Sequence, residues 1–270
     1  MTRPLVLKLG GELLEEASRM HATARVIARS AAATPFAVVH GGGREIDAAL
    51  ARAGIPTQQV DGVRVTDQPT LDIVVSVLAG AINTRFVAAI NAAGGRSVGL
   101  TGADCSVAPV EPMPPLRTAS GDTVPLGLVG QPVHDGVPHL VSHLVSGGYV
   151  PVVATIGAGP DGSLFNVNAD TMAAALAVRL KARRLLIAGT TAGVLGCDGR
   201  TIAELDLRAE LALAAAGTVN RGMLAKLQAC RAALAGGVPD VAIVDGRDQA
   251  LLRAALAGHD EAADSMTKVI

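Results

Sequence analysis

The sequence predicts an α/β fold with a mainly parallel central sheet. Short apolar runs rich in Val, Leu and Ile alternate with longer segments of helical periodicity, which is the pattern of repeated strand–helix–strand units. Of the 270 residues, 50% are hydrophobic but only 1% are aromatic, so the interior must be built from Ala, Val, Leu and Ile. Such a core suits parallel strands that are covered by helices on both faces.

Six short segments are predicted as strands, because each is a run of apolar, largely β-branched residues bounded by turn residues. In chain order they are Pro4–Leu9, Pro35–His40, Arg96–Leu100, Val150–Thr155, Arg184–Ala188 and Val241–Val244. The longer segments between them repeat apolar residues at helical spacing. The predicted helices are Leu13–Ala31, Gly43–Ala53, Pro69–Ala93, Pro138–Ser146, Asp170–Lys181, Leu205–Ala216, Gly222–Ala235 and Gln249–Ala257.

Two segments depart from this alternation. Val107–Val137 is rich in proline and glycine and predicts a β-hairpin excursion or a lid over a ligand. The turn-rich stretch Gly157–Gly162 marks either a domain boundary or an ordinary β-hairpin loop. Because 270 residues is near the size at which one core stops growing, we expect an N-terminal lobe of residues 1–165 and a C-terminal lobe of residues 166–270.

The predicted helix Pro69–Ala93 is apolar almost all round between Ile73 and Ile82. A surface helix keeps a polar stripe, so this helix is expected to be buried on two sides. Two interpretations follow: it forms the seam of a homodimer, or it is a central core helix of a single chain.

Composition excludes several classes of function. A net charge of −1 gives no broad basic field for nucleic acid, and the few aromatic residues offer no platform for stacking bases. The cysteines Cys105, Cys197 and Cys230 lie far apart, which predicts a reducing cytoplasmic location. The first apolar run breaks at Lys8 and no uninterrupted apolar stretch of membrane-spanning length follows, so neither a signal peptide nor a membrane partner is expected.

Four separate segments could meet at one polyphosphate. They are Lys8-Leu9-Gly10-Gly11, His40-Gly41-Gly42-Gly43, Asn166-Val167-Asn168-Ala169-Asp170 and Gly222-Met223-Leu224-Ala225-Lys226. Glycine turns at helix starts present backbone N–H groups that favour an anion. Lys8, Lys226 and Asp170 add charge, and together the segments indicate phosphoryl transfer.

Other enzyme motifs are absent or reversed. The chain has neither G-x-x-x-x-G-K-[ST] nor the protein-kinase signatures. His40–Gly43 and Gly95–Gly99 match the oxyanion and G-x-S-x-G motifs of α/β-hydrolase esterases, for which His259 would be the late histidine. A nucleophile elbow requires a strand before the serine, whereas here a helical pattern precedes Ser97 and a strand follows it. The esterase is therefore a remote alternative.

The collinear motifs resemble the amino acid kinase family, closest to its N-acetylglutamate kinases, over nearly the whole chain. The motifs are Lys8–Gly11, Val38–Gly43, Asp61–Thr66, Asn166–Asp170 and Gly222–Lys226. The resemblance implies an open αβα sandwich of the carbamate kinase-like type, whose N-terminal lobe binds the amino acid and dimerises while the C-terminal lobe binds ATP. It implies transfer of the γ-phosphoryl group to the side-chain carboxylate of N-acetyl-L-glutamate, the second step of arginine biosynthesis.

The resemblance also implies roles for single residues. Lys8 and Lys226 would approach the transferring group from opposite lobes, and Asp170 would hold both lysines in place. Gly10, Gly11 and Gly42 would donate backbone N–H groups to it. On the acceptor side, Gly42 and Gly43 would lie at the substrate carboxylate, with Arg64 as its guanidinium fork and Asn166 on the α-amino and acyl end.

For the nucleotide, the resemblance implies contacts along two stretches of the C-terminal lobe, together with the first glycine turn and one methionine. The corresponding residues are Gly10, Gly11, Thr190, Thr191, Ala192, Gly193, Val194, Leu195, Thr218, Val219, Asn220 and Met223. Gly189-Thr190-Thr191 departs from the Ser or Thr, Asp, Val run common in relatives. The missing aspartate leaves the ribose or adenine contact and the nucleotide preference open.

The cofactors expected are ATP and Mg²⁺, the latter bound mainly by the nucleotide phosphates and water, with no protein metal cage. Arginine-inhibited relatives carry an additional N-terminal helix, whereas this chain reaches its first strand at Pro4. The resemblance thus implies a homodimer with little arginine feedback, acting on small-molecule substrates.

Three alternatives share the scaffold or parts of it. N-succinylglutamate is a possible acceptor, because its extra carboxylate could pair with another arginine. Kinases of carrier-linked aminoadipate or glutamate usually replace the Asn166–Asp170 segment and carry a basic face, and this chain does neither. A non-catalytic amino-acid sensor would be expected to lack Lys8, Asp170 or Lys226, and all three are present.

Overall fold

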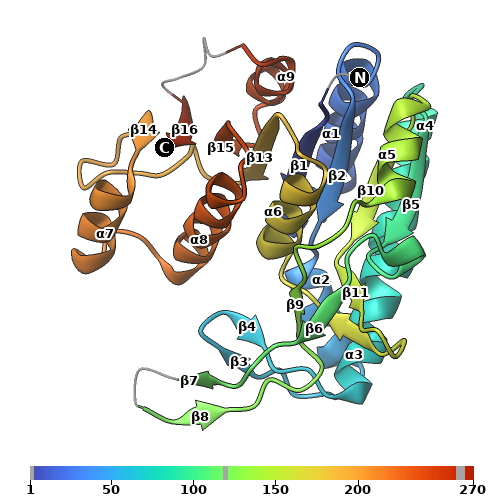
Figure 1. Ribbon diagram of the computed structural model, residues 1–270, viewed down its shortest axis with the longest axis vertical. Coiled ribbons are helices and arrows are strands. Elements are labelled where there is room, and N and C mark those ends of the chain that lie inside the picture. Colours follow the sequence, from blue (N-terminus) through green and yellow to red (C-terminus); the bar gives the residue numbers. More distant parts are fainter. Residues whose placement is uncertain (1–2, 118–120, 260–264) are drawn as a thin grey trace.

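The computed structural model describes residues 3–117, 121–259 and 265–270, and its centre is a twisted sheet (Figure 1). Within these residues the sheet has eight strands in the order β14-β16-β15-β13-β1-β2-β10-β5. Six of them are parallel neighbours: β1 (Leu5–Leu9), β2 (Phe36–His40), β5 (Ser97–Thr101), β10 (Val150–Ala154), β13 (Arg184–Gly189) and β15 (Val241–Asp245). These six confirm the predicted strands to within one residue at each end.

Two further strands extend the sheet beyond β15. β16 (Met266–Val269) runs antiparallel to β15, and β14 (Glu204–Leu205) runs parallel to β16. The sequence pattern places residue 205 in a predicted helix and predicts no strand at the C-terminus, and the structure differs at both points. Both strands are short and each includes at least one polar residue, so neither has the uninterrupted apolar sequence that predicts a buried strand.

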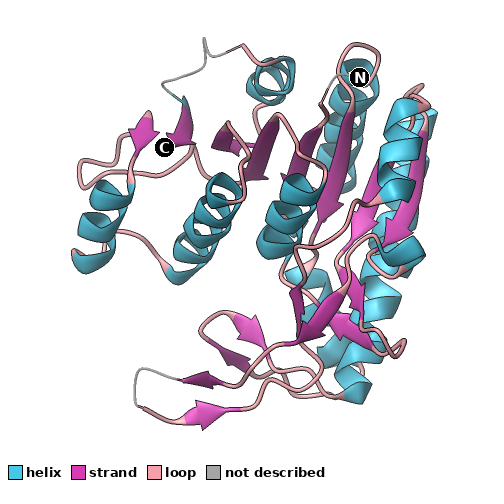
Figure 2. Cartoon of the chain, viewed as in Figure 1, coloured by secondary structure: helices cyan, strands magenta, loops and turns pink. Residues whose placement is uncertain are grey.

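Helices cover both faces of the sheet, as the all-buried strands require (Figure 2). One layer contains α1 (Ala17–Ser30), α4 (Asn83–Ala92) and α9 (Gln249–Ala257). The other contains α5 (His139–Ser146), α6 (Ala169–Arg179) and α8 (Arg221–Ala235), with α7 (Leu207–Ala215) beside them. Along β1, Leu5, Leu7 and Leu9 pack with the first layer and Val6 with the second. The predicted αβα sandwich is confirmed.

Short hairpins gather beyond the carboxyl end of β2, in the lower part of Figure 1. They pair β3 (Gln59–Val60) with β4 (Val63–Arg64), β6 (Val110–Pro112) with β9 (Gly130–Pro132), β7 (Leu116–Arg117) with β8 (Thr123–Val124), and β11 (Ile156–Ala158) with β12 (Leu164–Asn166). The hairpin excursion predicted for residues 107–137 is confirmed, although residues 118–120 lie outside the described chain. The stretch 157–162 is an ordinary hairpin turn between β11 and β12.

The long apolar segment is one continuous helix in three parts. α3 (Gln68–Val75) passes through a π-helical turn, η2 (Ser76–Ile82), into α4, and α2 (Gly43–Arg52) packs against α3 and η2. Its 25 residues are long and apolar enough to cross a membrane by composition alone. Leu78, Ile82 and Phe86 are at most 1% exposed, as in the core helix of a globular protein. Leu78 therefore belongs to the core of one chain and not to a seam between two.

The π-helical turn leads directly into a buried polar contact at the end of β2. Asn83, the first residue of α4, donates its side-chain amide to the Nε2 atom of His40 (3.0 Å) and to the carbonyl of Val152 (2.8 Å). Nε2 is thus the unprotonated nitrogen, and Nδ1–H donates to the carbonyl of Gly41 (3.1 Å). Complete burial lowers the pKa of His40 to about 4, with the hydrogen bond to Gly41 partly opposing the shift.

This buried histidine predicts a pH-dependent stability. The folded chain takes up the His40 proton near pH 4 and the unfolded chain near pH 6.5, so the unfolded chain binds more protons between these values. Folding stability contributed by neutral His40 is therefore present above pH 6.5 and declines as the pH falls towards 4. Between pH 7 and pH 5, wild type should lose about 2 kcal/mol more of its unfolding free energy than His40→Gln does.

Urea unfolding at the two pH values measures this difference. His143→Gln is the matched control, because His143 is exposed and should leave the wild-type pH dependence unchanged. An equal pH dependence in wild type and His40→Gln would show that His40 does not titrate as described.

Candidate active site

A cavity of about 350 Å³ lies where the carboxyl ends of β1 and β2 meet the hairpins and the starts of α2 and α6. Parallel strands place the residues that follow them at one edge of the sheet, which is where α/β folds bind ligands. All four sequence segments that we expected at a polyphosphate contribute to its wall. The contributing residues include Lys8, Gly10, Gly11, Gly41, Gly42, Gly43, Asn166, Asp170 and Lys226.

Two glycine turns approach each other so closely that side chains are excluded. A Cβ atom at Gly11 would come within 2.7 Å of the Gly42 Cα. One at Gly42 would overlap Ile82 and come within 2.9 Å of the Leu78 Cδ2 atom, both on the π-helical turn. α2 begins at Gly43 without a side-chain cap, so the N–H groups of its first turn are available to an anion.

Lys8 and Asp170 form a buried ion pair beneath this cradle. The Lys8 Nζ atom lies 2.8 Å from the Asp170 Oδ1 atom, and the two residues are only 5% and 6% exposed. Lys8 belongs to β1, whereas Asp170 lies in the first turn of α6. Asn168 fixes that turn, because its Oδ1 atom accepts hydrogen bonds from the backbone N–H groups of Asp170 (2.9 Å) and Thr171 (3.1 Å).

Lys226 reaches the same cavity from α8. Its Nζ atom donates to the carbonyl of Gly222 (3.4 Å), one turn earlier in the helix. Asp170 pairs with Lys8 rather than with Lys226 in this structure. The two lysines predicted to act together therefore line one cavity. Within the described residues, the charge of Lys8 is offset by a carboxylate, whereas the Lys226 ammonium bonds to a backbone carbonyl.

Arg64 lines the acceptor end of the cavity and is held by two groups. Its Nη1 atom lies 2.6 Å from the Asp47 Oδ1 atom, and its Nη2 atom donates to the carbonyl of Gly43 (3.4 Å). Because a guanidinium has five N–H donors, donors remain for a substrate carboxylate. Asn166 lines the same cavity and donates to the Thr66 hydroxyl (3.2 Å). The sequence analysis did not predict a role for Asp47. The available indication was its spacing, because Asp47 lies four residues after Gly43 and so on the same face of α2.

The remaining residues predicted for the nucleotide lie beside the cavity rather than in its wall. The loop Thr190–Leu195 follows β13, next to Gly10, whose N–H donates to the carbonyl of Ala188 (2.9 Å). Val194 is fully buried, and its N–H donates to the Thr267 hydroxyl (2.7 Å). The second stretch, Thr218–Asn220, precedes α8, and Asn220 caps that helix through the N–H of Met223 (2.8 Å).

One exposed ion pair joins two elements that contribute to the cavity wall. The Nη1 atom of Arg221, at the start of α8, lies 3.3 Å from the Oδ1 atom of Asp61, at the turn between β3 and β4. It connects the hairpin that carries Arg64 with the helix that carries Lys226.

The serine motif has no catalytic geometry. Ser97 begins β5, after α4, and its hydroxyl donates to the Val87 carbonyl (3.2 Å) and the Asn91 side chain (2.9 Å). His259 follows α9, which packs on β13 and β15, whereas Ser97 lies on β5 at the edge of the sheet beyond β10. No bond between His259 and Ser97 exists in the described structure. The order of helix, serine and strand expected from the sequence is confirmed, which removes the nucleophile elbow.

Comparison with known proteins agrees with this geometry. The model of the "Amino acid kinase family" matches residues 3–245. Acetylglutamate kinase of Dinoroseobacter shibae is 40% identical over 90% of this chain and 82% of its own, and that of Azoarcus is 38% identical over 95% and 87%.

Solved structures share the fold. N-acetylglutamate synthase from Neisseria gonorrhoeae superposes with a TM-score of 0.81 at 23% identity, over 99% of this chain and 59% of that one. Giardia carbamate kinase superposes with a TM-score of 0.67 at 16% identity, over 100% and 99% of the two chains. With its motifs in one cavity and this breadth of similarity, the chain belongs to the amino acid kinase family.

Proposed function

We propose that this protein transfers the γ-phosphoryl group of ATP to the side-chain carboxylate of N-acetyl-L-glutamate, giving N-acetyl-L-glutamyl 5-phosphate and ADP. This is the second step of arginine biosynthesis. The observation that carries the proposal is the convergence of Lys8, Lys226 and two glycine turns on one cavity that also contains Arg64. The relatives that match most of the chain at about 40% identity are acetylglutamate kinases.

The chemistry needs cations rather than a general base. A side-chain carboxylate has a reference pKa of about 4.3, so the acceptor is already ionised at neutral pH. One of its oxygens forms a bond to the γ-phosphorus while the bond from phosphorus to the β–γ bridging oxygen breaks, and ADP leaves with those electrons. Both reactants are anionic, so Lys8, Lys226 and the N–H groups of Gly11 and Gly42 stabilise the charge on the transferring group. The N–H of Gly10, which the sequence also predicts as a donor, is instead bonded to the carbonyl of Ala188.

Mg²⁺ is proposed to enter with ATP and to neutralise part of the phosphate charge. The phosphates and water are proposed to supply most of its ligands. Three carboxylates do line the cavity. Asp47 and Asp170 are paired with Arg64 and Lys8, and Glu12 is the third.

On the acceptor side, we assign Arg64, Gly42 and Gly43 to the α-carboxylate and Asn166 to the α-amino and acyl end. N-succinylglutamate is the alternative acceptor.

For the nucleotide, the loops Thr190–Leu195 and Thr218–Asn220 with Met223 are proposed to contact the base and ribose. Residues 1–165 would then form the acceptor lobe and residues 166–270 the ATP lobe. A cytoplasmic location fits this reaction.

ADP release across a panel of acceptors tests the reaction. N-acetylglutamate should give the highest kcat/KM among N-acetylglutamate, N-succinylglutamate, glutamate, aspartate and aminoadipate. In Lys226→Ala, kcat should fall about 10²–10³-fold, because a preorganised cation is removed from the transferring group. Lys226 is preferred to Lys8 for this test, since removing Lys8 would leave Asp170 charged and buried.

Lys268→Ala is the matched control, because Lys268 is equally half-buried but lies on β16. Its kcat should equal that of wild type. Near-normal turnover by Lys226→Ala would refute the assigned role, and no ADP release with any acceptor in the panel would refute the reaction.

Arg64→Lys tests the acceptor site. An ammonium cannot reproduce the planar guanidinium fork that contacts both Asp47 and a substrate carboxylate, so KM for the acyl amino acid should rise about tenfold or more. KM for ATP should change far less. Steady-state kinetics with each substrate varied in turn gives both values, with the exposed Arg85→Lys as control. Equal increases in both KM values would contradict the assignment.

We also propose a homodimer, formed through the outer face of the long helix and the neighbouring strand β5. β5 is an edge of the sheet, and an unpaired edge is a ready template for another chain. Beside it, the exposed helix positions Gly80, Ala81, Thr84 and Ala88 are small and uncharged. Thr84 and Ala88 line a groove of about 480 Å³ between the helix and β5.

Ala88→Arg should therefore convert a dimer into a monomer, because it places a long charged side chain in the groove. Light scattering on the eluted protein measures the mass. Ala51→Arg, at an exposed position of α2 away from β5, is the control and should remain dimeric. Wild type at the mass of one chain would refute the dimer, and a dimeric Ala88→Arg would place the seam elsewhere.

A further inference from the structure

Glu12 occupies an unexpected position for an acidic residue. It lies in the 3₁₀ turn Gly11–Leu13, directly after the first glycine turn, and it lines the cavity. A Cβ atom at Gly10 would lie 2.5 Å from the Glu12 Oε1 atom, so the carboxylate folds back over the glycine. A Cβ atom at Gly189 would lie 3.8 Å from that same oxygen and 3.8 Å from the Lys226 Cε atom. The carboxylate therefore sits between the ends of β1 and β13, close to Lys226.

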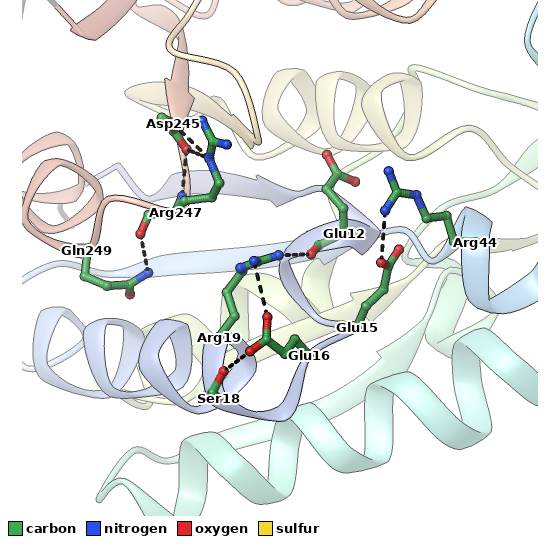
Figure 3. Close-up of polar contacts among 9 residues, drawn as sticks. All are labelled: Glu12, Glu15, Glu16, Ser18, Arg19, Arg44, Asp245, Arg247 and Gln249. Atoms are coloured by element: carbon green, nitrogen blue, oxygen red, sulfur yellow. Dashed lines mark hydrogen bonds and ion pairs between the residues drawn. The ribbon is translucent and has the colours of Figure 1, made fainter.

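No described side chain or backbone group bonds to this carboxylate. Its neighbours in sequence are engaged: Glu15 pairs with Arg44 (3.4 Å), and Glu16 pairs with Arg19 (3.3 Å) (Figure 3). Arg19 does approach Glu12, but its Nη1 atom donates to the backbone carbonyl (3.0 Å), while the Glu12 carboxylate extends away from it (Figure 3). The side chain is half-buried, so the cavity is the space into which its charge projects.

A free carboxylate in a polyphosphate site is electrostatically unfavourable unless a cation lies between the two anions. Asp170 offsets the charge of Lys8, and Asp47 offsets that of Arg64. Arg44 is paired with Glu15, so among the described cations of the cavity wall Lys226 is the one without a carboxylate partner, and it faces both Glu12 and the incoming phosphates. Like charges brought together in a partly desolvated site repel each other strongly, whereas a hard divalent cation binds both carboxylate and phosphate oxygens.

We propose that Glu12 faces the Mg²⁺ of MgATP, directly or through a bound water, and makes the site select the metal-bound nucleotide over free ATP. Glu12 is then a specificity-determining residue for the phosphoryl donor. The inference rests on the proposed placement of the nucleotide phosphates at Gly10, Gly11 and Lys226. A competing explanation is that Glu12 is only a counter-ion for Lys226 and has no preference between the two nucleotide forms.

Calorimetric titration of ATP measures the selection without any turnover. The dissociation constant is determined for wild type and Glu12→Gln, once in EDTA and once in excess MgCl₂, and the metal-free value is divided by the value in Mg²⁺. The glutamine has the same shape but no charge, so this ratio should fall about tenfold in Glu12→Gln. Glu16→Gln, outside the cavity on the same segment, should keep the wild-type ratio.

A ratio in Glu12→Gln equal to or greater than that of wild type would overturn the proposal. Lys226→Ala, titrated in the same way, separates this failure from a failure of the phosphate site. If Lys226→Ala weakens ATP binding while Glu12→Gln leaves the ratio unchanged, the phosphate site stands and the role of Glu12 is wrong. If Lys226→Ala binds ATP as wild type does under both conditions, the phosphates are not where the proposed function places them, and both proposals are refuted.

Discussion

The buried ion pair between Lys8 and Asp170 is the constraint on which the site depends. Removing two charges from water is costly, and the cost is recovered only when geometry and further hydrogen bonds are favourable. Here β1 fixes the lysine, and the capped first turn of α6 fixes the carboxylate through Asn168. The ion pair therefore fixes the position of α6 relative to β1 at the carboxyl edge of the sheet. The glycine turns that follow β1 and β2 lie around this ion pair.

The second constraint is steric and comes from the long helix. Its π-helical turn brings Leu78 and Ile82 against Gly42, while Asn83 fixes the ring of His40 beneath the same glycine turn. Single π-helical turns within α-helices are frequent at functional sites. The face of this helix towards the sheet thus shapes the anion cradle, and its outer face is the one assigned to the partner chain.

The regular part of the fold could be predicted from sequence because its signals are local. Buried parallel strands such as β1 and β13 are uninterrupted apolar runs, and helices such as α9 show clear periodicity and caps. β14 and β16 were not predicted because each is short and partly polar. The π-helical turn was not predicted because its pattern of apolar residues resembles that of an α-helix. The glycine and lysine motifs predicted the cavity, but the sequence did not predict the roles of Asp47 and Glu12. Those roles depend on which neighbouring cations form ion pairs in the folded chain, and such pairs are not visible in the sequence.

The ion pair between Asp61 and Arg221 has a consequence for how products leave. Both side chains are exposed, and exposed pairs contribute little, roughly 0–1 kcal/mol. Hairpin and helix can consequently part without a large penalty, even though the groups that they carry are tightly organised inside. An acyl phosphate is prone to hydrolysis, so a cavity whose base is held by buried ion pairs shields the mixed anhydride while it forms, and the weak exposed pair between two of its walls allows them to separate for its release.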